Sequence, residues 1–290
     1  MNIDRFIEAR KQLGLAQSEL CEGICTQATL SRFENNGQVP NLKILMKLCN
    51  RLNLSLGDLF PKIGVKNPEA IEKMNQIEFW LITSEFEQAS QLLKTLDVHA
   101  LEKDQLLKLR YHYLEGFLLM YNQAPTMDIM FVFDQIITAP LTEQSEIFHM
   151  LAYTGIGMIY MDEDDQDKAE FYFHKVMERI YNYPHQTIED TWRVLHVVFQ
   201  SSVFYSEANE IEISDALCHF AINICSDNHV TYYLARAAIQ LAKNAIKQQA
   251  ERSQILELIY DARAYSKINR NTVALTELKK MEKTVKQEEL

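Results

Sequence analysis

Hydrophobic residues recur every three or four positions through most of the chain, which is the spacing of one face of an α-helix. The alternation of apolar and polar residues that marks a half-buried strand does not stand out in the sequence. In the first predicted helix the inward positions are Ile3, Phe6, Ile7 and Leu13. The pattern therefore predicts an all-α protein.

Residues 16–34 predict a helix-turn-helix. One short helix begins at Gln17, and residues 23–25 turn the chain. Thr26 then offers a hydroxyl that can cap a second helix. Leu30 and Phe33 are three residues apart on that helix, so they share a face and can pack inward.

The opposite face of the second helix carries polar side chains that can reach DNA. The residues expected to point outward are Gln27, Ala28, Ser31 and Arg32. Glutamine and arginine pair with the edges of adenine and guanine in the major groove. We therefore expect base or phosphate contacts from Gln27 and Arg32, the alternative being a solvated helix face.

The remainder of the first domain is predicted from helix caps and breakers. Asn41 follows Pro40 and can cap a fourth helix, and Ser55 opens a fifth short helix, Leu56–Phe60. The inward positions of the fourth helix are expected to be Leu42, Leu45, Met46 and Leu48, with Cys49 on the same side. Prolines and a glycine follow closely and break helix geometry. The expected domains are 1–62 and 69–290, with 63–68 as linker.

Helix pairs repeat through the second domain. The clearest pair has Gly157, Tyr160, Ala169 and Phe173 at small and aromatic offsets that let two antiparallel helices approach closely. Three further pairs are indicated by Trp80 with Ala89, by Gly116 with Pro125 in the turn, and by Tyr205, Ala216 and Phe220. Residues 230–285 add a fifth pair and a charged capping helix. About five tetratricopeptide-like pairs with a period of about 40 residues predict an α-solenoid, whose first helices line a concave surface suited to an extended ligand.

Charge separates the two domains. Residues 1–66 hold nine Lys/Arg against six Asp/Glu, a net +3, and this leaves −14 for residues 67–290 out of the total of −11. Phosphate contact is thus plausible for the first part and disfavoured for the second. A net +3 is modest, so two copies in a dimer would hold DNA better than one.

Several function classes are disfavoured. No segment approaches the roughly 18 apolar residues of a membrane span, and the charged N-terminus lacks the apolar core of a signal peptide, so we expect a cytoplasmic protein without membrane contact.

The five cysteines form no CxxC pair and are expected to be reduced, mostly core thiols. The acidic run 162–167 lacks the glycine and the glutamate that an EF-hand requires, so it is expected to be a solvated turn. With no catalytic motif or phosphate loop, we expect neither an enzyme nor a cofactor or metal.

The motifs in the first 60 residues resemble the Cro/phage-repressor (XRE) helix-turn-helix, on Leu13-Gly14-Leu15, Gln17, Glu19-Leu20 and Ser31-Arg32-Phe33-Glu34-Asn35. The stretch GICTQATLSRFENN resembles more closely the PlcR/Rgg/PrgX kind of peptide-pheromone-responsive regulator from Gram-positive bacteria. The resemblance implies a tetratricopeptide-like C-terminal domain that binds a short signalling peptide. It therefore implies a homodimeric transcription regulator with a DNA operator and a peptide as partners.

The resemblance also assigns roles to individual residues. Gln17 would begin its helix and touch phosphate, and Arg10 would pair with Glu34. Ala28 departs from the family, since it leaves only an apolar contact such as one with a thymine methyl. The sequence Asn35-Asn36-Gly37 is one residue longer than usual, which puts phosphate contacts there in doubt. The expected DNA-binding set is Gln17, Thr26, Gln27, Ala28, Ser31, Arg32 and Lys43.

Repeat offsets indicate candidate residues for the peptide site. An extended peptide needs amide or cationic partners for its backbone and carboxylate, and aromatic or methionine pockets for its side chains. Counted by these offsets, the candidates are Tyr113, Phe117, Tyr121, Thr154, Met158, His196 and Phe199, and the residues expected close by are Arg193, Gln200, Tyr233, Arg236 and Gln240. The alternative for each is ordinary packing between helices. The alternative for the whole chain is an interaction scaffold whose repeats grip a protein partner while the small domain tethers it to DNA.

Overall fold

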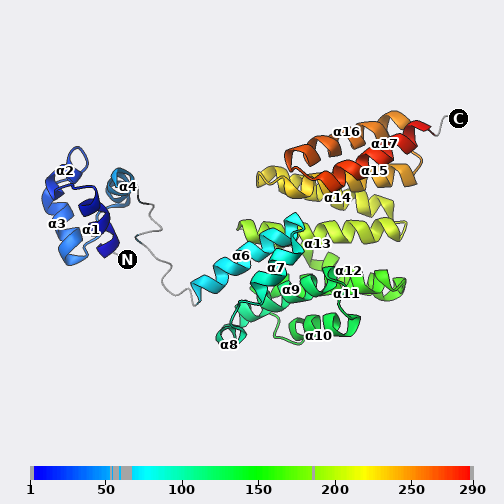
Figure 1. Ribbon diagram of the computed structural model, residues 1–290, viewed down its shortest axis with the longest axis horizontal. Helices are drawn as coiled ribbons and strands as arrows, with labels where there is room; N and C mark the ends of the chain where they lie inside the picture. The colour runs from blue at the N-terminus through cyan, green and yellow to red at the C-terminus, as the bar shows by residue number, and fades with distance from the viewer. Residues whose placement is uncertain (1–2, 53, 55–58, 60–66, 185–186, 288–290) are drawn as a thin grey trace. The chain divides into compact units, whose positions relative to one another are not determined.

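The computed structural model describes residues 3–52, 54, 59, 67–184 and 187–287 (Figure 1). The chain divides into two compact units, Met1–Lys66 and Asn67–Leu290. The described residues are organised in helices, with no strand among them. The all-α prediction is confirmed for this part of the chain.

The first unit contains four described helices around a small core. They are α1 (Ile3–Gln12), α2 (Gln17–Cys21), α3 (Gln27–Asn36) and α4 (Leu42–Arg51). Phe6 of α1 meets Phe33 of α3 edge to face, with ring centroids 5.1 Å apart, and Leu20, Leu30 and Leu48 are buried around them. The fifth predicted helix, Leu56–Phe60, lies outside the described residues except for Leu59, which is buried.

The predicted caps of this unit are confirmed. The Thr26 hydroxyl accepts a hydrogen bond from the Thr29 N–H at 3.3 Å at the start of α3. Asn41 Oδ1 accepts from the Ile44 N–H at 2.9 Å at the start of α4. Each cap satisfies a helix N–H that has no partner within its own helix.

Three inward positions predicted for this unit are wrong. Leu13 is 50 % exposed because α1 ends at Gln12, and the chain turns away through Gly14. Leu42 and Met46 are 62 % and 46 % exposed. They lie one turn apart, beside the stripe of α4 that is buried, and the core of this small unit is narrower than the apolar stripe of the helix.

The second unit consists of helix pairs. The first helices of the pairs are α6 (Pro68–Thr83), α9 (Gln105–Tyr121), α11 (Glu146–Asp162), α13 (Ile188–Glu207) and α15 (Tyr232–Lys247). The second helices are α7 (Phe86–Leu93), α10 (Thr126–Ile137), α12 (Gln166–Ile180), α14 (Ile211–Asp227) and α16 (Arg252–Ile268). The short α8 (Val98–Leu101) follows the first pair, and α17 (Thr272–Gln287) packs on α16 as the capping helix. The five predicted pairs and the cap are confirmed.

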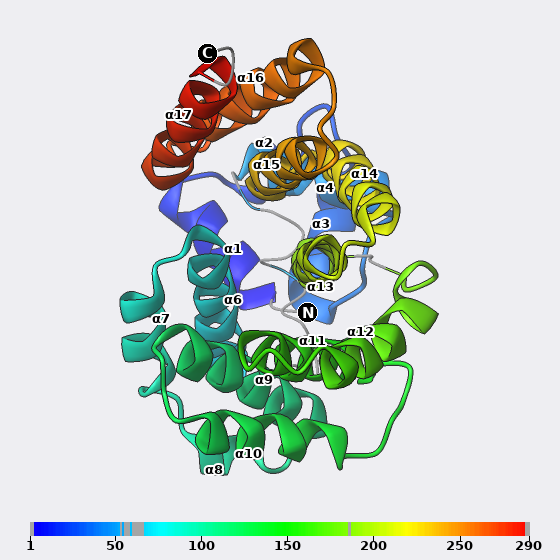
Figure 2. The same ribbon diagram turned by 90° about the vertical axis from the view of Figure 1, so that its right-hand side faces the viewer.

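The pairs stack in chain order through the second unit (Figures 1 and 2). Each first helix contacts the next first helix along the chain, which makes a continuous inner layer from α6 to α15. In addition, α6 contacts α13, which belongs to the fourth pair. The first pair therefore folds back toward the fourth across the inner face.

Three of the second helices, α7, α12 and α14, have a small buried residue at their fourth position, which lets the paired helices approach closely. Ala89 of α7 and Ala169 of α12 occupy this position and are fully buried, as predicted. In α14 the equivalent residue is Ser214, which is also fully buried and whose hydroxyl donates to the Ser202 carbonyl at 2.7 Å. Ala216 was predicted on the assumption of about two extra residues in the turn before α14, but that turn has the same three residues as the turn before α12, so Ala216 is two positions too late and is exposed.

Glycines let aromatic rings lie between helices. A methyl group added at Gly155 of α11 would come within 2.3 Å of the Phe133 ring from α10, and one at Gly116 of α9 within 2.6 Å. A methyl group added at Gly157 of α11 would likewise come within 2.8 Å of the Phe173 ring from α12. Phe133 and Phe173 are fully buried, so these rings have little room to move.

Gly155→Ala is expected to lower the stability of the second unit. Overpacking a core typically costs about 1–3 kcal/mol, and the gain in helix propensity of about 1 kcal/mol offsets only part of it. The urea midpoint of the full chain measures the change. The same substitution should cost less in a Phe133→Leu background, and a Gly155→Ala chain more stable than wild type would contradict this packing.

Candidate functional site

The outer face of α3 presents the side chains that the sequence places there. Gln27, Ala28 and Arg32 are exposed and Ser31 is half-buried, whereas Leu30 and Phe33 on the opposite face are fully buried. The predicted orientation of the second helix of the motif is confirmed.

A chain of hydrogen bonds links this face to the core of the first unit. The Arg10 guanidinium donates to both oxygens of the Glu34 carboxylate, at 2.7 and 2.9 Å, which confirms that ion pair. Gln17 begins α2, as expected, and its Nε2 donates to Glu34 Oε2 at 2.7 Å. Gln27 Nε2 in turn donates to Gln17 Oε1 at 2.9 Å. The bidentate Arg10–Glu34 ion pair thus holds the Gln17 side chain in place, and Gln17 in turn orients Gln27.

The hydrogen-bonding groups left on this face suit base edges. Gln27 keeps one amide N–H and its oxygen, the pair that adenine requires. The Arg32 guanidinium makes no hydrogen bond or ion pair with the described residues, so its fork of donors is available. Ser31 Oγ accepts from Asn35 at 3.1 Å. Thr26 at the start of α3 and Lys43 in the first turn of α4 are both exposed.

One residue that positions the motif was missed in the sequence. Arg51, the last residue of α4, donates from Nη1 to the carbonyls of Leu20 and Glu22 at 3.0 and 2.7 Å. A cation at the C-terminal end of α2 satisfies carbonyls that have no partner inside that helix. Only the tertiary fold brings the two segments together, so no local signal marks Arg51.

A narrow pocket opens on the inner face of the second unit, with an empty volume of about 300 Å³. Its walls come from α6, α9, α13 and α15, and are formed by Glu78, Leu81, Ile82, Tyr113, Phe117, Tyr121, Trp192, His196 and Tyr233. Five of the predicted peptide-site residues are among them, from three different repeats. The structure therefore brings part of the predicted set together.

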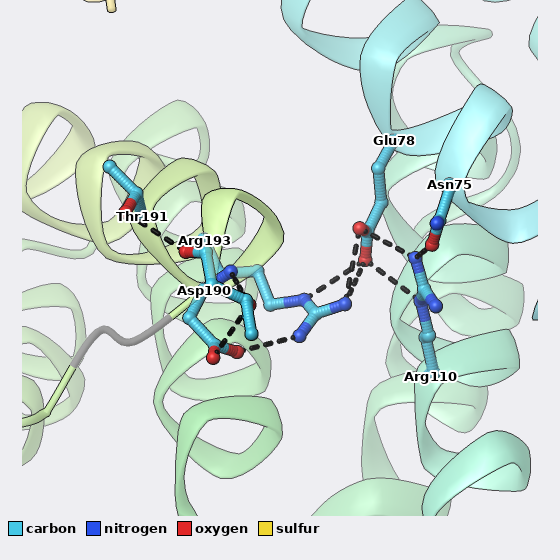
Figure 3. Close-up of polar contacts among 7 residues, drawn as sticks. Asn75, Glu78, Arg110, Asp190, Thr191 and Arg193 are labelled. Atoms are coloured by element: carbon cyan, nitrogen blue, oxygen red, sulfur yellow. Dashed lines mark hydrogen bonds and ion pairs between the residues drawn. The ribbon is translucent and has the colours of Figure 1, made fainter. Parts of the chain in front are cut away.

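Glu78 of α6 lies at the centre of this region between two arginines (Figure 3). Arg110 of α9 donates to its two oxygens from Nε and Nη2 at 3.1 and 2.7 Å. Arg193 of α13 donates to them from Nε and Nη2 at 2.9 to 3.1 Å. The side chain of Glu78 is 1 % exposed and those of the arginines 8 % and 9 %. One carboxylate thus joins three helices of the inner layer.

The outer ends of the two guanidiniums also have acceptors. Asn75 Oδ1 accepts from Arg110 Nη2 at 2.6 Å, and Asp190 Oδ1 accepts from Arg193 Nη1 at 3.0 Å. The Phe148 ring lies against the Arg193 guanidinium, 5.2 Å away. Burial lowers the pKa of Arg193, but Glu78, Tyr113 and Asp190 together raise it above its ordinary value. Arg193 therefore stays charged.

Some predicted residues lie next to the pocket. Arg236 of α15 lies over the rings of Tyr233 and Phe199, at 5.0 and 6.0 Å, and donates to the Ile82 carbonyl at 2.8 Å. Gln200 forms a side-chain hydrogen bond with Tyr121. Met158 of α11 packs against the core and does not line the pocket.

Two predicted peptide-site residues are wrong. Thr154 is fully buried in α11, and its hydroxyl donates to the Met150 carbonyl at 2.8 Å. Gln240 is 5 % exposed and donates to Asn244 Oδ1 at 2.9 Å within a polar network between α13, α14 and α15. Both residues lie on first helices of their pairs, but their side chains face neighbouring helices.

Four lining residues are not among the predicted ones: Glu78, Leu81, Ile82 and Trp192. Glu78 carries a visible signal, since it is the single acid in the apolar run 77–82, and a buried acid needs a cationic partner.

The remaining candidates are structural. Cys21, Cys49, Cys218 and Cys225 are buried and Cys25 is half-buried, with no disulfide among them. Asp165 in the acidic run caps α12 by accepting from the Lys168 N–H at 3.3 Å, as a solvated turn allows. Groups of three metal-ligating side chains are absent from the described residues. The described helices are also too short or too polar to cross a membrane.

Comparison with known families identifies the first unit. Residues 6–59 match the model of the helix-turn-helix family HTH_3, so the N-terminal unit is a helix-turn-helix domain of the DNA-binding type. No curated protein sequence matches the chain.

Solved structures share the fold over nearly the whole chain. PlcR from Bacillus thuringiensis, in complex with the peptide PapR7 and DNA, has 15 % identity and a TM-score of 0.58, with 98 % of each chain covered. ComR from S. thermophilus, with DNA and its signalling peptide ComS, has 13 % identity and a TM-score of 0.56, over 97 % of this chain and 98 % of ComR. The pheromone receptor Rgg2 from Streptococcus dysgalactiae has 10 % identity and a TM-score of 0.50, over 97 % and 98 %. The likeness confirms the expected architecture of a helix-turn-helix followed by helical repeats.

Glu78→Gln is expected to destabilise the second unit strongly. Removing one partner of a buried ion pair leaves uncompensated charge and costs about 3–5 kcal/mol. Urea unfolding of the full chain measures this loss. Glu69→Gln on the same helix is the matched control, because Glu69 is exposed and pairs only with Lys73. Equal midpoints for the two variants would contradict the role given to Glu78.

Proposed function

We propose that the protein is a cytoplasmic, sequence-specific transcription regulator that acts as a homodimer. The helix-turn-helix domain binds a DNA operator, and a short signalling peptide on the inner face of the repeats controls that binding. The observation that carries the proposal is the exposed face of α3, where Gln27 is oriented through Gln17 by the Arg10–Glu34 pair.

Each side chain on this face has a role set by its chemistry. Gln27 pairs with an adenine and Arg32 with a guanine, while Ala28 contacts a thymine methyl. Ser31 lies between them and hydrogen-bonds either base type. The residues at the edges of the motif, Gln17, Thr26 and Lys43, contact phosphates and fix the register of the domain on the duplex.

Dimerisation follows from the small number of these contacts. Residues 1–66 carry a net +3, and a single α3 offers two to four base-reading side chains. Two copies on a near-palindromic operator place their recognition helices in successive major grooves, about 34–36 Å apart. The acidic second unit is repelled by DNA, so it serves for dimerisation and for binding the peptide.

The inner face supports a peptide ligand. It combines aromatic side chains with cationic and amide groups, as in Tyr113, Phe117 and Arg236, which is the mixture an extended peptide requires. Two proteins of the same fold, PlcR and ComR, have been crystallised with both DNA and a peptide. The peptide acts by binding one arrangement of the dimer better than another.

Arg32→Ala is expected to weaken operator binding by about 1–3 kcal/mol and to relax the preference for one base pair. The operator is first selected from genomic fragments with the full chain, and its affinity is then measured by fluorescence anisotropy. Lys267→Ala removes the same charge from an exposed site on α16 and should leave affinity and preference unchanged. An unaltered Arg32→Ala profile would show that α3 does not read the bases.

Peptide control is tested with the same operator and a random heptapeptide library. Some peptides should change operator affinity about 5- to 150-fold, which is the usual range of allosteric coupling. If no peptide has an effect while a protein partner co-purifies with the chain, the interaction-scaffold alternative is correct and peptide control is wrong.

A further inference from the structure

Unsatisfied polar atoms single out the inner-face pocket. Among the buried side-chain nitrogens and oxygens of the described residues, three have no hydrogen-bond partner: His112 Nε2, Trp192 Nε1 and His196 Nε2. The latter two lie one turn apart on α13, and both residues line the pocket. Buried donors without partners are rare and costly in folded proteins. Two of them in one pocket indicate that a ligand supplies their acceptors.

Trp192 Nε1 is a donor, and His196 Nε2 is one in the tautomer that accepts at Nδ1. The indole Nε1–H of Trp192 can only donate. His196 Nδ1 lies 3.2 Å from the hydroxyl of Tyr233, which is 1 % exposed. When this hydroxyl donates to Nδ1, the imidazole carries its proton on Nε2. Burial, and to a lesser extent the charge of Arg236, lowers the pKa of His196 to about 3, so the ring is neutral at physiological pH.

The rest of the pocket selects against a cationic ligand. The one carboxylate in the walls, Glu78, already accepts from both arginines. Arg236 adds a further positive charge beside the pocket. The surfaces between these polar groups are apolar or aromatic, and include Leu81, Ile82 and Phe117. An apolar group flanked by oxygen acceptors fits this lining, and an ammonium group does not.

We infer that this pocket takes one aromatic or aliphatic residue of the peptide, whose carbonyl or carboxylate oxygens accept hydrogen bonds from Trp192 Nε1 and His196 Nε2. The inference rests on the proposed peptide control and adds the chemistry of one subsite. Much of the pocket's empty volume of about 300 Å³ lies at its open mouth, so its walls must move apart to admit one side chain, and a whole heptapeptide does not fit. Trp192 and His196 are therefore specificity-determining residues.

The indole signals of the protein test this directly. The chain has two tryptophans, Trp80 and Trp192, so a ¹H–¹⁵N spectrum of the full chain shows two indole signals, which Trp80→Phe and Trp192→Phe assign. N-acetyl-phenylalaninamide is the probe, because it carries a ring and two carbonyl acceptors. A saturable downfield shift of the Trp192 indole proton is expected, with the Trp80 signal in place.

Further probes separate the contributions of the ligand. N-acetyl-glycinamide has the acceptors without the ring and should bind more weakly. N-acetyl-phenylalanine carries a carboxylate, and tighter binding than that of the amide would assign the subsite to a peptide C-terminus, whereas weaker binding would assign it to an internal residue. No movement of the Trp192 signal up to about 10 mM of either phenylalanine probe, a range that covers the weak affinity of such small ligands, would overturn the inference.

Failure of the subsite can be told from failure of the proposed function. A selected peptide that changes operator affinity but leaves the Trp192 indole signal in place contradicts the subsite and not the peptide control. Conversely, a Trp192 shift with the phenylalanine probe, in a protein whose operator affinity no peptide alters, supports the pocket and contradicts the control.

Discussion

The buried carboxylate of Glu78 is the interaction on which the inner face of the repeat unit depends. It receives hydrogen bonds from Arg110 and Arg193, which lie 32 and 115 residues away in the sequence. Desolvating three charged groups is costly, and the arrangement is tolerated because both carboxylate oxygens accept from both arginines and each guanidinium has a further acceptor, Asn75 or Asp190. The cluster joins α6 to α13 together with the rings of Phe79 and Trp192, whose centroids lie 6.0 Å apart.

The same cluster limits what the inner face can enclose. Because α6 crosses toward the fourth pair, the pocket is small, whereas an extended heptapeptide spans roughly 23–25 Å. A peptide that anchors one residue in the pocket must run along the first helices outside it or shift α6. The second case would disturb Glu78 and move the first pair relative to the fourth, which is one physical route from peptide binding to a different arrangement of the dimer.

Local features of the sequence were enough to predict the helix-turn-helix motif of the first unit. The caps Thr26 and Asn41 and the outward face of α3 depend on neighbouring residues, and the structure has them where expected. The wrong predictions concern residues whose burial depends on the segments packed against their helix. Leu42 and Met46 have helical spacing, but the core is too narrow to cover them.

The candidate pocket could be predicted only in part. Tyr113, Phe117, Tyr121 and His196 followed from the repeat offsets, and Tyr233 was expected close by. Thr154 and Gln240 instead face neighbouring helices. The contact between Glu78 and Arg193 joins distant repeats, so no spacing rule reveals it. The unpartnered donor of Trp192 likewise becomes visible only once its surroundings are known.

The central claim is that peptide binding on the repeats and operator binding on the helix-turn-helix are coupled through one equilibrium. Thermodynamic linkage makes such coupling reciprocal. The most direct measurement is the affinity of a selected peptide for the full chain, with and without a saturating operator duplex. The account predicts that the operator changes the peptide affinity by the same factor, different from one, by which the peptide changes the operator affinity. A peptide affinity that is identical with and without operator would contradict it.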